Sequence, residues 1–148
     1  IKYSYLSQDR ERDVVFTWDK ALNFEGNSGP YIQYAYVRAK KIGQNIDLPT
    51  FEKNPNLELS ANDKLLIAKI REFPKKVNET LAKYKPHILA NYAYDVAVSF
   101  NSFYVHTPKI LEEKNENLKF FRLHLVAKTA EILKKTFELL GIEMPSEM

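Results

Sequence analysis

Apolar residues recur every three or four positions over most of the chain after residue 28, which is the spacing of one buried helix face. The first such stripe consists of Ile32, Ala35, Ala39 and Ile42. Ser28 is placed to cap this helix, Pro30 fits its first turn, and Gly43 is typical of a helix end. The pattern predicts a helix over 28–43.

A loop containing Pro49 and Pro55 comes next, and the helical pattern then restarts at Ser60. Ser60 and Asp63 have the spacing of a capping box. The stripe that follows consists of Leu66, Ile70, Phe73, Val77 and Leu81. Pro74 interrupts it, and because proline has no N–H and clashes with the preceding turn, we expect a kink or break near Phe73.

Two longer helices are predicted in the second half. One runs from Pro86 to about His106 and ends before Pro108; its stripe consists of Leu89, Ala93, Val96, Phe100 and Phe103. Its opposite face is also rather apolar, which favours a central place in a bundle. The last helix begins near Leu118 and stops at Gly141. Together the patterns predict an all-α fold, a bundle of about five helices.

The first 22 residues differ from the rest. Asp13 to Trp18 (DVVFTW) are rich in β-branched and aromatic residues, which predicts a short extended segment. We interpret residues 1–22 as the tail of a preceding region and residues 23–148 as the helical bundle. Because Ile1 is not an initiator methionine, we expect the chain to be part of a longer protein.

Composition adds few constraints. The chain has 148 residues, 45% hydrophobic and 28% charged, with a net charge of +3. It has no cysteine, no run near eighteen apolar residues and no secretion signal. We expect a cytoplasmic protein with no membrane or DNA partner.

The sequence offers no catalytic centre. It contains no GxSxG, Walker or GxGxxG motif, and its three histidines, His87, His106 and His124, lie in separate segments. We predict no catalytic residue, no metal site and no cofactor bound by this chain.

Aromatic and basic residues alternate in a way typical of RNA-binding surfaces. Tyr31, Tyr34 and Tyr36 lie close to Arg38, and the segment from Asp63 to Lys85 has seven Lys or Arg against three acids. Single-stranded RNA is bound by stacking on aromatic rings and by cations at phosphates. A plainer interpretation stays open, in which the tyrosines are core residues and the lysines aid solubility.

Three strings narrow these possibilities. They are DVVFTWDKALNFEGNSGPYIQYAYVRAKKI (residues 13–42), KPHILANYAYDVAVSFNSFYVHTPKIL (85–111) and FRLHLVAKTAEILKKTFELLGIEMPSEM (121–148). The first resembles the segment after the catalytic core of arginyl-tRNA synthetases, and the others resemble the C-terminal anticodon-binding bundle of that family, the DALR domain. Residues from about 43 to 83 match weakly.

The resemblance implies a part of a class I ligase that attaches arginine to its tRNA using ATP with magnesium, in a catalytic Rossmann domain absent from this chain. It implies two partners, the anticodon loop of arginine tRNA and the protein's own catalytic domain. By motif position, the anticodon-binding residues implied are Asn23, Phe24, Glu25, Gly26, Asn27, Ser28, Tyr34, Arg38, Tyr104 and Met148.

Two positions depart from the family pattern: Pro108 replaces an aromatic residue found in some relatives, and Tyr36 replaces a common histidine. Two other functions stay open, an anticodon bundle of another class I synthetase, such as the cysteine or methionine enzyme, and a basic helical protein-interaction module. For single residues, Tyr34 and Tyr104 could instead be core tyrosines, and Arg38 could pair with Glu25.

Overall fold

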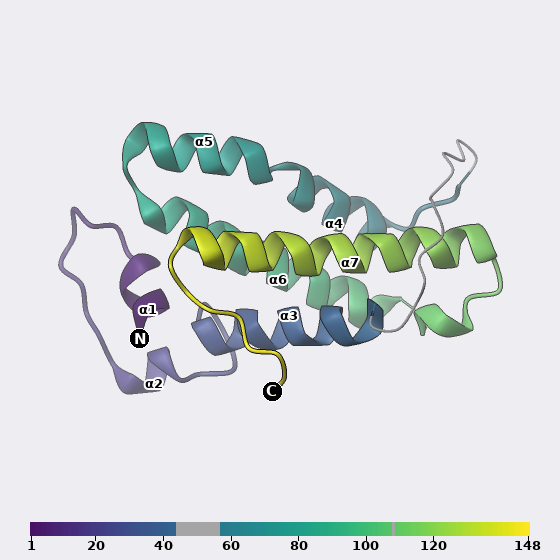
Figure 1. Ribbon diagram of the computed structural model, residues 1–148, viewed down its shortest axis with the longest axis horizontal. Helices are drawn as coiled ribbons and strands as arrows, with labels where there is room; N and C mark the ends of the chain where they lie inside the picture. The colour runs from purple at the N-terminus through teal and green to yellow at the C-terminus, as the bar shows by residue number, and fades with distance from the viewer. Residues whose placement is uncertain (44–56, 108) are drawn as a thin grey trace.

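The predicted helices are present in the computed structural model, which describes residues 1–43, 57–107 and 109–148. All regular structure in these ranges is helical (Figure 1). The elements are α1 (Lys2–Leu6), α2 (Trp18–Ala21), α3 (Gly29–Gly43), α4 (Ala61–Arg71), α5 (Phe73–Lys83), α6 (Pro86–His106), the 3₁₀ helix η1 (Ile110–Glu112) and α7 (Glu116–Leu139). The five long helices α3 to α7 confirm the all-α bundle.

Local signals account for most helix ends. The Ser28 hydroxyl accepts from Tyr31 N–H at 3.2 Å at the start of α3, and Ser60 and Asp63 form the predicted capping box of α4. The predicted break falls at Glu72, between α4 and α5, with Pro74 in the first turn of α5. One stripe residue was wrongly predicted as buried: Leu81 is 66% exposed, in the last turn of α5, a helix that has no fully buried residue. The loop with Pro49 and Pro55 lies outside the described residues, as does Pro108.

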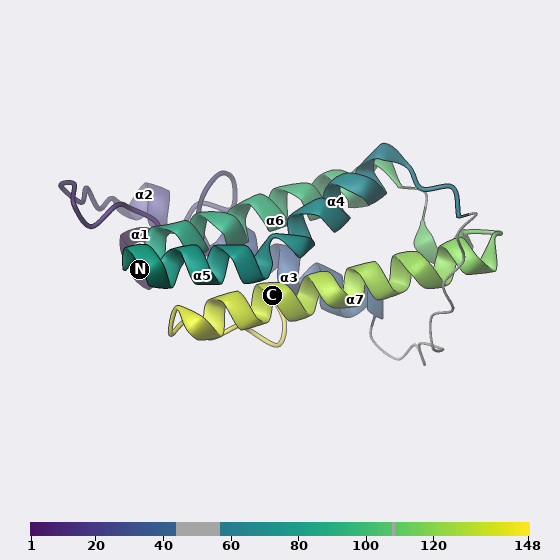
Figure 2. The same ribbon diagram turned by 90° about the horizontal axis from the view of Figure 1, so that it is seen from above.

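The central helix is α6, as its two apolar faces predicted. It contacts α3, α4, α5 and α7, while α3 packs along α7 (Figure 1). Seen from above, α4, α5 and α6 lie together in one layer beside α7 (Figure 2). The centre of the core is formed by fully buried side chains of α3, α6 and α7: Ile32, Val96, Phe100, Phe103, Leu133 and Phe137.

The N-terminal segment is more structured than predicted. It contains α1 and α2, and its residues 13–17 have no regular structure. Tyr3 of α1 is buried and stacks on Phe137 with ring centroids 5.7 Å apart. The Tyr3 side chain lies close to the backbone of Gly29, where an added Cβ would lie 3.3 Å from the Tyr3 Cβ. Thus α1 completes one end of the core, which the local sequence did not indicate.

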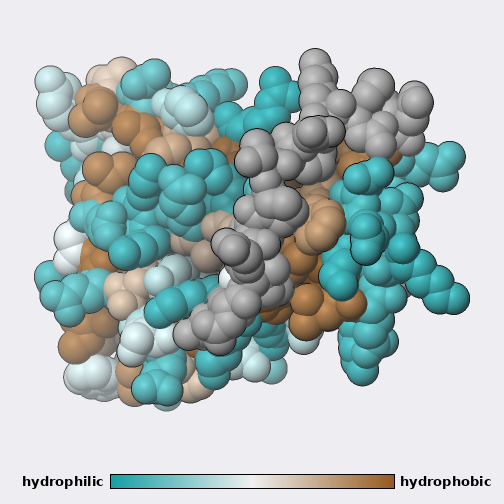
Figure 3. Space-filling view, turned by 45° about the vertical axis from the view of Figure 1, so that its right-hand side comes forward, coloured by the Kyte–Doolittle hydropathy of each residue, from teal (hydrophilic) through white to brown (hydrophobic). Residues whose placement is uncertain are grey.

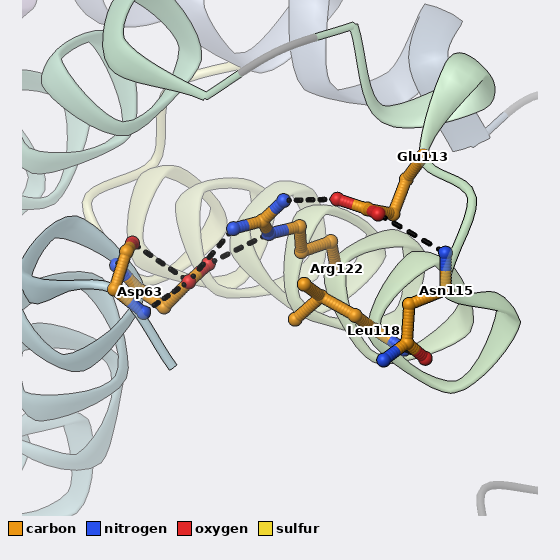
Figure 4. A network of polar contacts seen from close by, with 6 residues as sticks. Asp63, Glu113, Asn115, Leu118 and Arg122 are labelled. Carbon is orange, nitrogen blue, oxygen red and sulfur yellow. Dashed lines mark hydrogen bonds and ion pairs between the residues drawn. The ribbon is translucent and has the colours of Figure 1, made fainter. Parts of the chain in front are cut away.

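A buried ionic network joins α4 to α7. The Arg122 guanidinium donates to both carboxylate oxygens of Asp63 at 3.1 Å and to Glu113 at 3.0 Å (Figure 4). Asp63 has no exposed surface and Arg122 has 6%. Burial alone would raise the pKa of Asp63, but hydrogen bonds from Arg122 and Ser60 lower it below its ordinary value. We call Arg122, Asp63 and Glu113 the Arg122 network.

The surface is mixed in character. On the face seen in Figure 3, hydrophobic side chains form separate patches between hydrophilic ones. None of the helices in the described ranges is long and apolar enough to cross a bilayer.

Candidate RNA-binding site

Three of the predicted site residues meet on one surface. Tyr34 and Arg38 lie one turn apart on α3, and Tyr104 comes from the last turns of α6. The Arg38 Cζ lies 4.6 Å from the centre of the Tyr34 ring and 4.8 Å from that of the Tyr104 ring. Both distances are within the range of cation–π attraction. Helices far apart in sequence therefore place two aromatic rings around one cation.

Both rings remain accessible to solvent. Tyr34 is 44% exposed and Tyr104 is 43% exposed, so neither is a core residue. Tyr104 also contacts the buried Phe100, with ring centroids 6.3 Å apart, which anchors its inner side. Rings held on one side and open on the other can receive a stacked base.

The charge of Arg38 has no acidic neighbour in the ranges that the structure describes. In the described part of the chain it forms no ion pair, with Glu25 or any other carboxylate. Its Nη1 donates a hydrogen bond to the Asn101 side-chain oxygen at 3.2 Å. We call Tyr34, Arg38, Tyr104 and Asn101 the Arg38 cluster. It presents a positive charge, with no carboxylate partner among the described residues, between two aromatic rings.

The predicted loop 23–28 has a defined conformation at the start of α3. The Asn23 side chain accepts from Glu25 N–H at 2.8 Å, and the Ser28 hydroxyl donates to the Asn23 carbonyl. Gly26 has φ of 76°, in the left-handed region where glycine carries no Cβ penalty. Phe24 is 61% exposed at the tip of this loop.

Asn27 fastens the loop to the bundle. Its side chain donates to Asn91 of α6 at 2.7 Å and accepts from the Tyr3 hydroxyl at 2.5 Å. Asn91 lies 13 residues before Tyr104 on the same helix, which corresponds to about 20 Å along its axis. The loop and the Arg38 cluster are thus two separate parts of one surface.

The C-terminal tail is held on α3. After α7, Gly141 has φ of 67°, and Ile142 N–H donates back to the Phe137 carbonyl at 2.8 Å. Gln33 of α3 donates to the Glu143 carbonyl at 3.2 Å, and Figure 1 shows the tail crossing α3. Met148 at its end is 48% exposed.

Comparisons with known proteins identify the fold. A family model described as "DALR anticodon binding domain" matches residues 32–148. The chain belongs to this family. An arginine–tRNA ligase of Methanococcus maripaludis strain C6 is 38% identical over all of this chain and 26% of its own length. That of Histophilus somni strain 2336 is 41% identical over all of this chain and 26% of its own length.

Solved structures agree. Arginyl-tRNA synthetase of Thermus thermophilus superposes with a TM-score of 0.87 at 28% identity, over 99% of this chain and 26% of the other. The Plasmodium falciparum enzyme gives 0.81 at 34% identity, over 99% and 26%. The family resemblance seen in the sequence is therefore confirmed. This DALR domain spans about a quarter of the length of the curated relatives that it matches.

Sequence reasoning missed two contributors to the site of this DALR domain. Asn101 carries no signal of its own in the sequence, although its place three residues before Tyr104 puts it on the same helix face. Tyr3, whose pKa burial raises, supports the loop from a segment that had been assigned to another region. Tyr36, the departure from the family pattern, is buried at 7% exposure and so lies away from the accessible rings. In the described ranges, no group of three or more acidic or histidine side chains could hold a metal ion.

Proposed function

We propose that this DALR domain recognises the anticodon loop of arginine tRNA as part of an arginine–tRNA ligase. The observation that carries the proposal is the Arg38 cluster. It places a cation, which has no carboxylate partner in the described part of the chain, between two half-exposed tyrosine rings. The whole-chain similarity to arginine–tRNA ligases supports the choice of tRNA and favours it over the bundle of another class I synthetase.

Recognition would combine stacking with charge. The inner faces of Tyr34 and Tyr104 contact Arg38, so unstacked anticodon bases would stack on their open sides. The remaining N–H groups of Arg38 would donate to a phosphate. The phosphate contact is independent of sequence, whereas base contacts provide discrimination.

The loop 23–28 and Met148 would add contacts on either side of this cluster. Phe24 offers an exposed ring on a loop that hydrogen bonds hold in place. Met148 offers a flexible, polarisable side chain suited to packing on a base. We include Asn23, Phe24, Glu25, Gly26, Asn27 and Ser28 with Met148 in the proposed interface.

The first 22 residues would face the catalytic part of the ligase. Tyr5 stacks on Phe16 at 5.5 Å, and Phe16 meets Trp18 edge to face at 5.2 Å. Tyr5 and Trp18 are 48% and 59% exposed, an unusual concentration of apolar surface for so short a segment. Since the relatives are about four times as long, the rest of the protein is the natural cover for this surface.

The chemistry of the ligase would lie outside this chain. Activation of arginine needs ATP with magnesium, and these 148 residues carry no phosphate-binding motif. We expect the purified chain to show no arginine-dependent exchange of pyrophosphate into ATP and no tRNA charging. Robust activity of either kind would contradict the assignment.

The direct test is binding of an anticodon stem-loop of arginine tRNA to the chain. Three phosphate contacts to single-stranded RNA would weaken binding about fourfold for each doubling of salt. We expect affinity to fall further when the middle anticodon base is changed. Equal affinity for all middle bases would leave only nonspecific ionic binding and would contradict the proposal.

A further inference from the structure

Arg38 is fixed on three sides. Its guanidinium lies between the rings of Tyr34 and Tyr104, and its Nη1 donates to Asn101 Oδ1 at 3.2 Å. A long arginine side chain on a surface normally samples many rotamers, and ordering it costs free energy when a ligand binds. Here the protein itself has already met this cost.

Asn101 supplies the in-plane contact. The two rings restrict the guanidinium from above and below, but they leave it free to turn within its own plane. A hydrogen bond to Nη1 removes that freedom. Asn101 is half-buried on α6, three residues before Tyr104, so the same helix face fixes both the ring and the amide.

The acceptor is neutral, which distinguishes this site from the Arg122 network. Arg122 is also held by oxygen acceptors, but these are the carboxylates of Asp63 and Glu113, which neutralise its charge. An aspartate at position 101 would have nearly the shape of asparagine and would accept the same hydrogen bond. It would also form an ion pair with Arg38 and remove the charge that a phosphate needs.

We propose that Asn101 is a positioning residue of the RNA-binding surface, which orients the Arg38 guanidinium for a phosphate while leaving its charge uncompensated. The role rests on the proposed recognition of the anticodon loop. It assigns a specific task to the amide group that neither alanine nor aspartate can perform.

The experiment measures stem-loop affinity of the chain as a function of salt for the wild type, Asn101→Asp and Val105→Asp. Val105 is the matched control, since it lies on the same helix beside Tyr104, is 71% exposed and gives the same change in net charge. Loss of one phosphate contact lowers the slope of log K against log salt by about 0.7 and the affinity about fivefold at 0.1 M salt. We expect this for Asn101→Asp, beyond any change in Val105→Asp.

Asn101→Ala separates orientation from charge. It keeps the Arg38 charge, so the salt slope should stay at the wild-type value while affinity falls. In the free chain, nuclear magnetic resonance should show slow rotation of the Arg38 guanidinium in the wild type and in Asn101→Asp, but fast rotation in Asn101→Ala. Asn101→Asp also removes the side-chain N–H group of Asn101, but loss of this neutral donor alone would not change the salt slope. Loss of orientation and loss of charge are therefore distinguishable as causes of weaker binding.

Two results would overturn the role of Asn101 while leaving the proposed function intact. One is base-dependent binding by the wild type with the same salt slope in Asn101→Asp and Val105→Asp. The other is equally fast guanidinium rotation in the wild type and Asn101→Ala. Failure of the wild type to bind the stem-loop would instead contradict the proposed function itself.

Discussion

Two arginines of this DALR domain are both fixed by side chains distant and near in the sequence, yet the two have different functions. Arg122 is buried and meets two carboxylates, whereas Arg38 is half-buried and meets two rings and an amide. A buried charge must be paired, since an uncompensated one is very costly. A charge at the surface has no such requirement and stays available to a ligand. The comparison separates an arginine that maintains the fold from one placed to bind.

The largest expected effect is on the stability that the buried Arg122 network provides. Arg122→Met should lower the free energy of unfolding by about 3–5 kcal/mol, because it leaves Asp63 buried without its cation. Urea denaturation measures this, and the double variant with Asp63→Asn should recover part of the loss. A change below about 1 kcal/mol would contradict the structural role, because a loss that small is typical of exposed ion pairs.

The next largest effect is on RNA binding by the two tyrosine rings of the Arg38 cluster. Tyr104→Ala should weaken stem-loop binding by about 1–3 kcal/mol if the ring stacks on a base. Tyr34→Ala should behave alike. Tyr84→Ala is the control, since Tyr84 is 75% exposed but lies outside the Arg38 cluster and should leave binding unchanged. If melting shows a large loss of stability while the folded fraction binds normally, the rings are structural.

Acid should distinguish the two arginine sites as well. The folded-state pKa of Asp63 is lowered, whereas an unfolded aspartate has a pKa of about 3.9. Its contribution to stability is therefore complete above about pH 4 and is lost as the pH falls through the lower folded pKa. We expect Asp63→Asn to flatten the fall of unfolding free energy below pH 4. Arg38→Gln should leave that part of the curve unchanged.

The smallest effect on stability concerns the tail. Deleting residues 146–148 leaves the contacts of Gln33 with Glu143 and of Ile142 with Phe137 in place, so the melting temperature should hardly change. Stem-loop binding by the chain, and arginine charging by the parent ligase, should fall if Met148 packs on a base. Unchanged charging kinetics in the truncated ligase would remove Met148 from the interface.

Much of the fold was predictable because its signals are local. Ser60 with Asp63 marks the start of α4, Pro74 ends the preceding helix, and Gly141 follows the last one, each through contacts within a few residues. The two apolar faces of α6 predicted its central position for the same reason. The strings around Tyr34 and Tyr104 also indicated the family, and hence the candidate site.

What the sequence by itself determined is therefore the helices, their order and the residue types of the site. The tertiary structure decided which side chains meet: Asp63 with Arg122 across 59 positions, Arg38 with Asn101 across 63, and Tyr3 with Ala90 across 87. Periodicity reports which face of a helix is buried, but it does not say which helix covers that face. For that reason an aspartate read as a helix cap also became the partner of a buried arginine, and an unremarkable asparagine came to lie against Arg38.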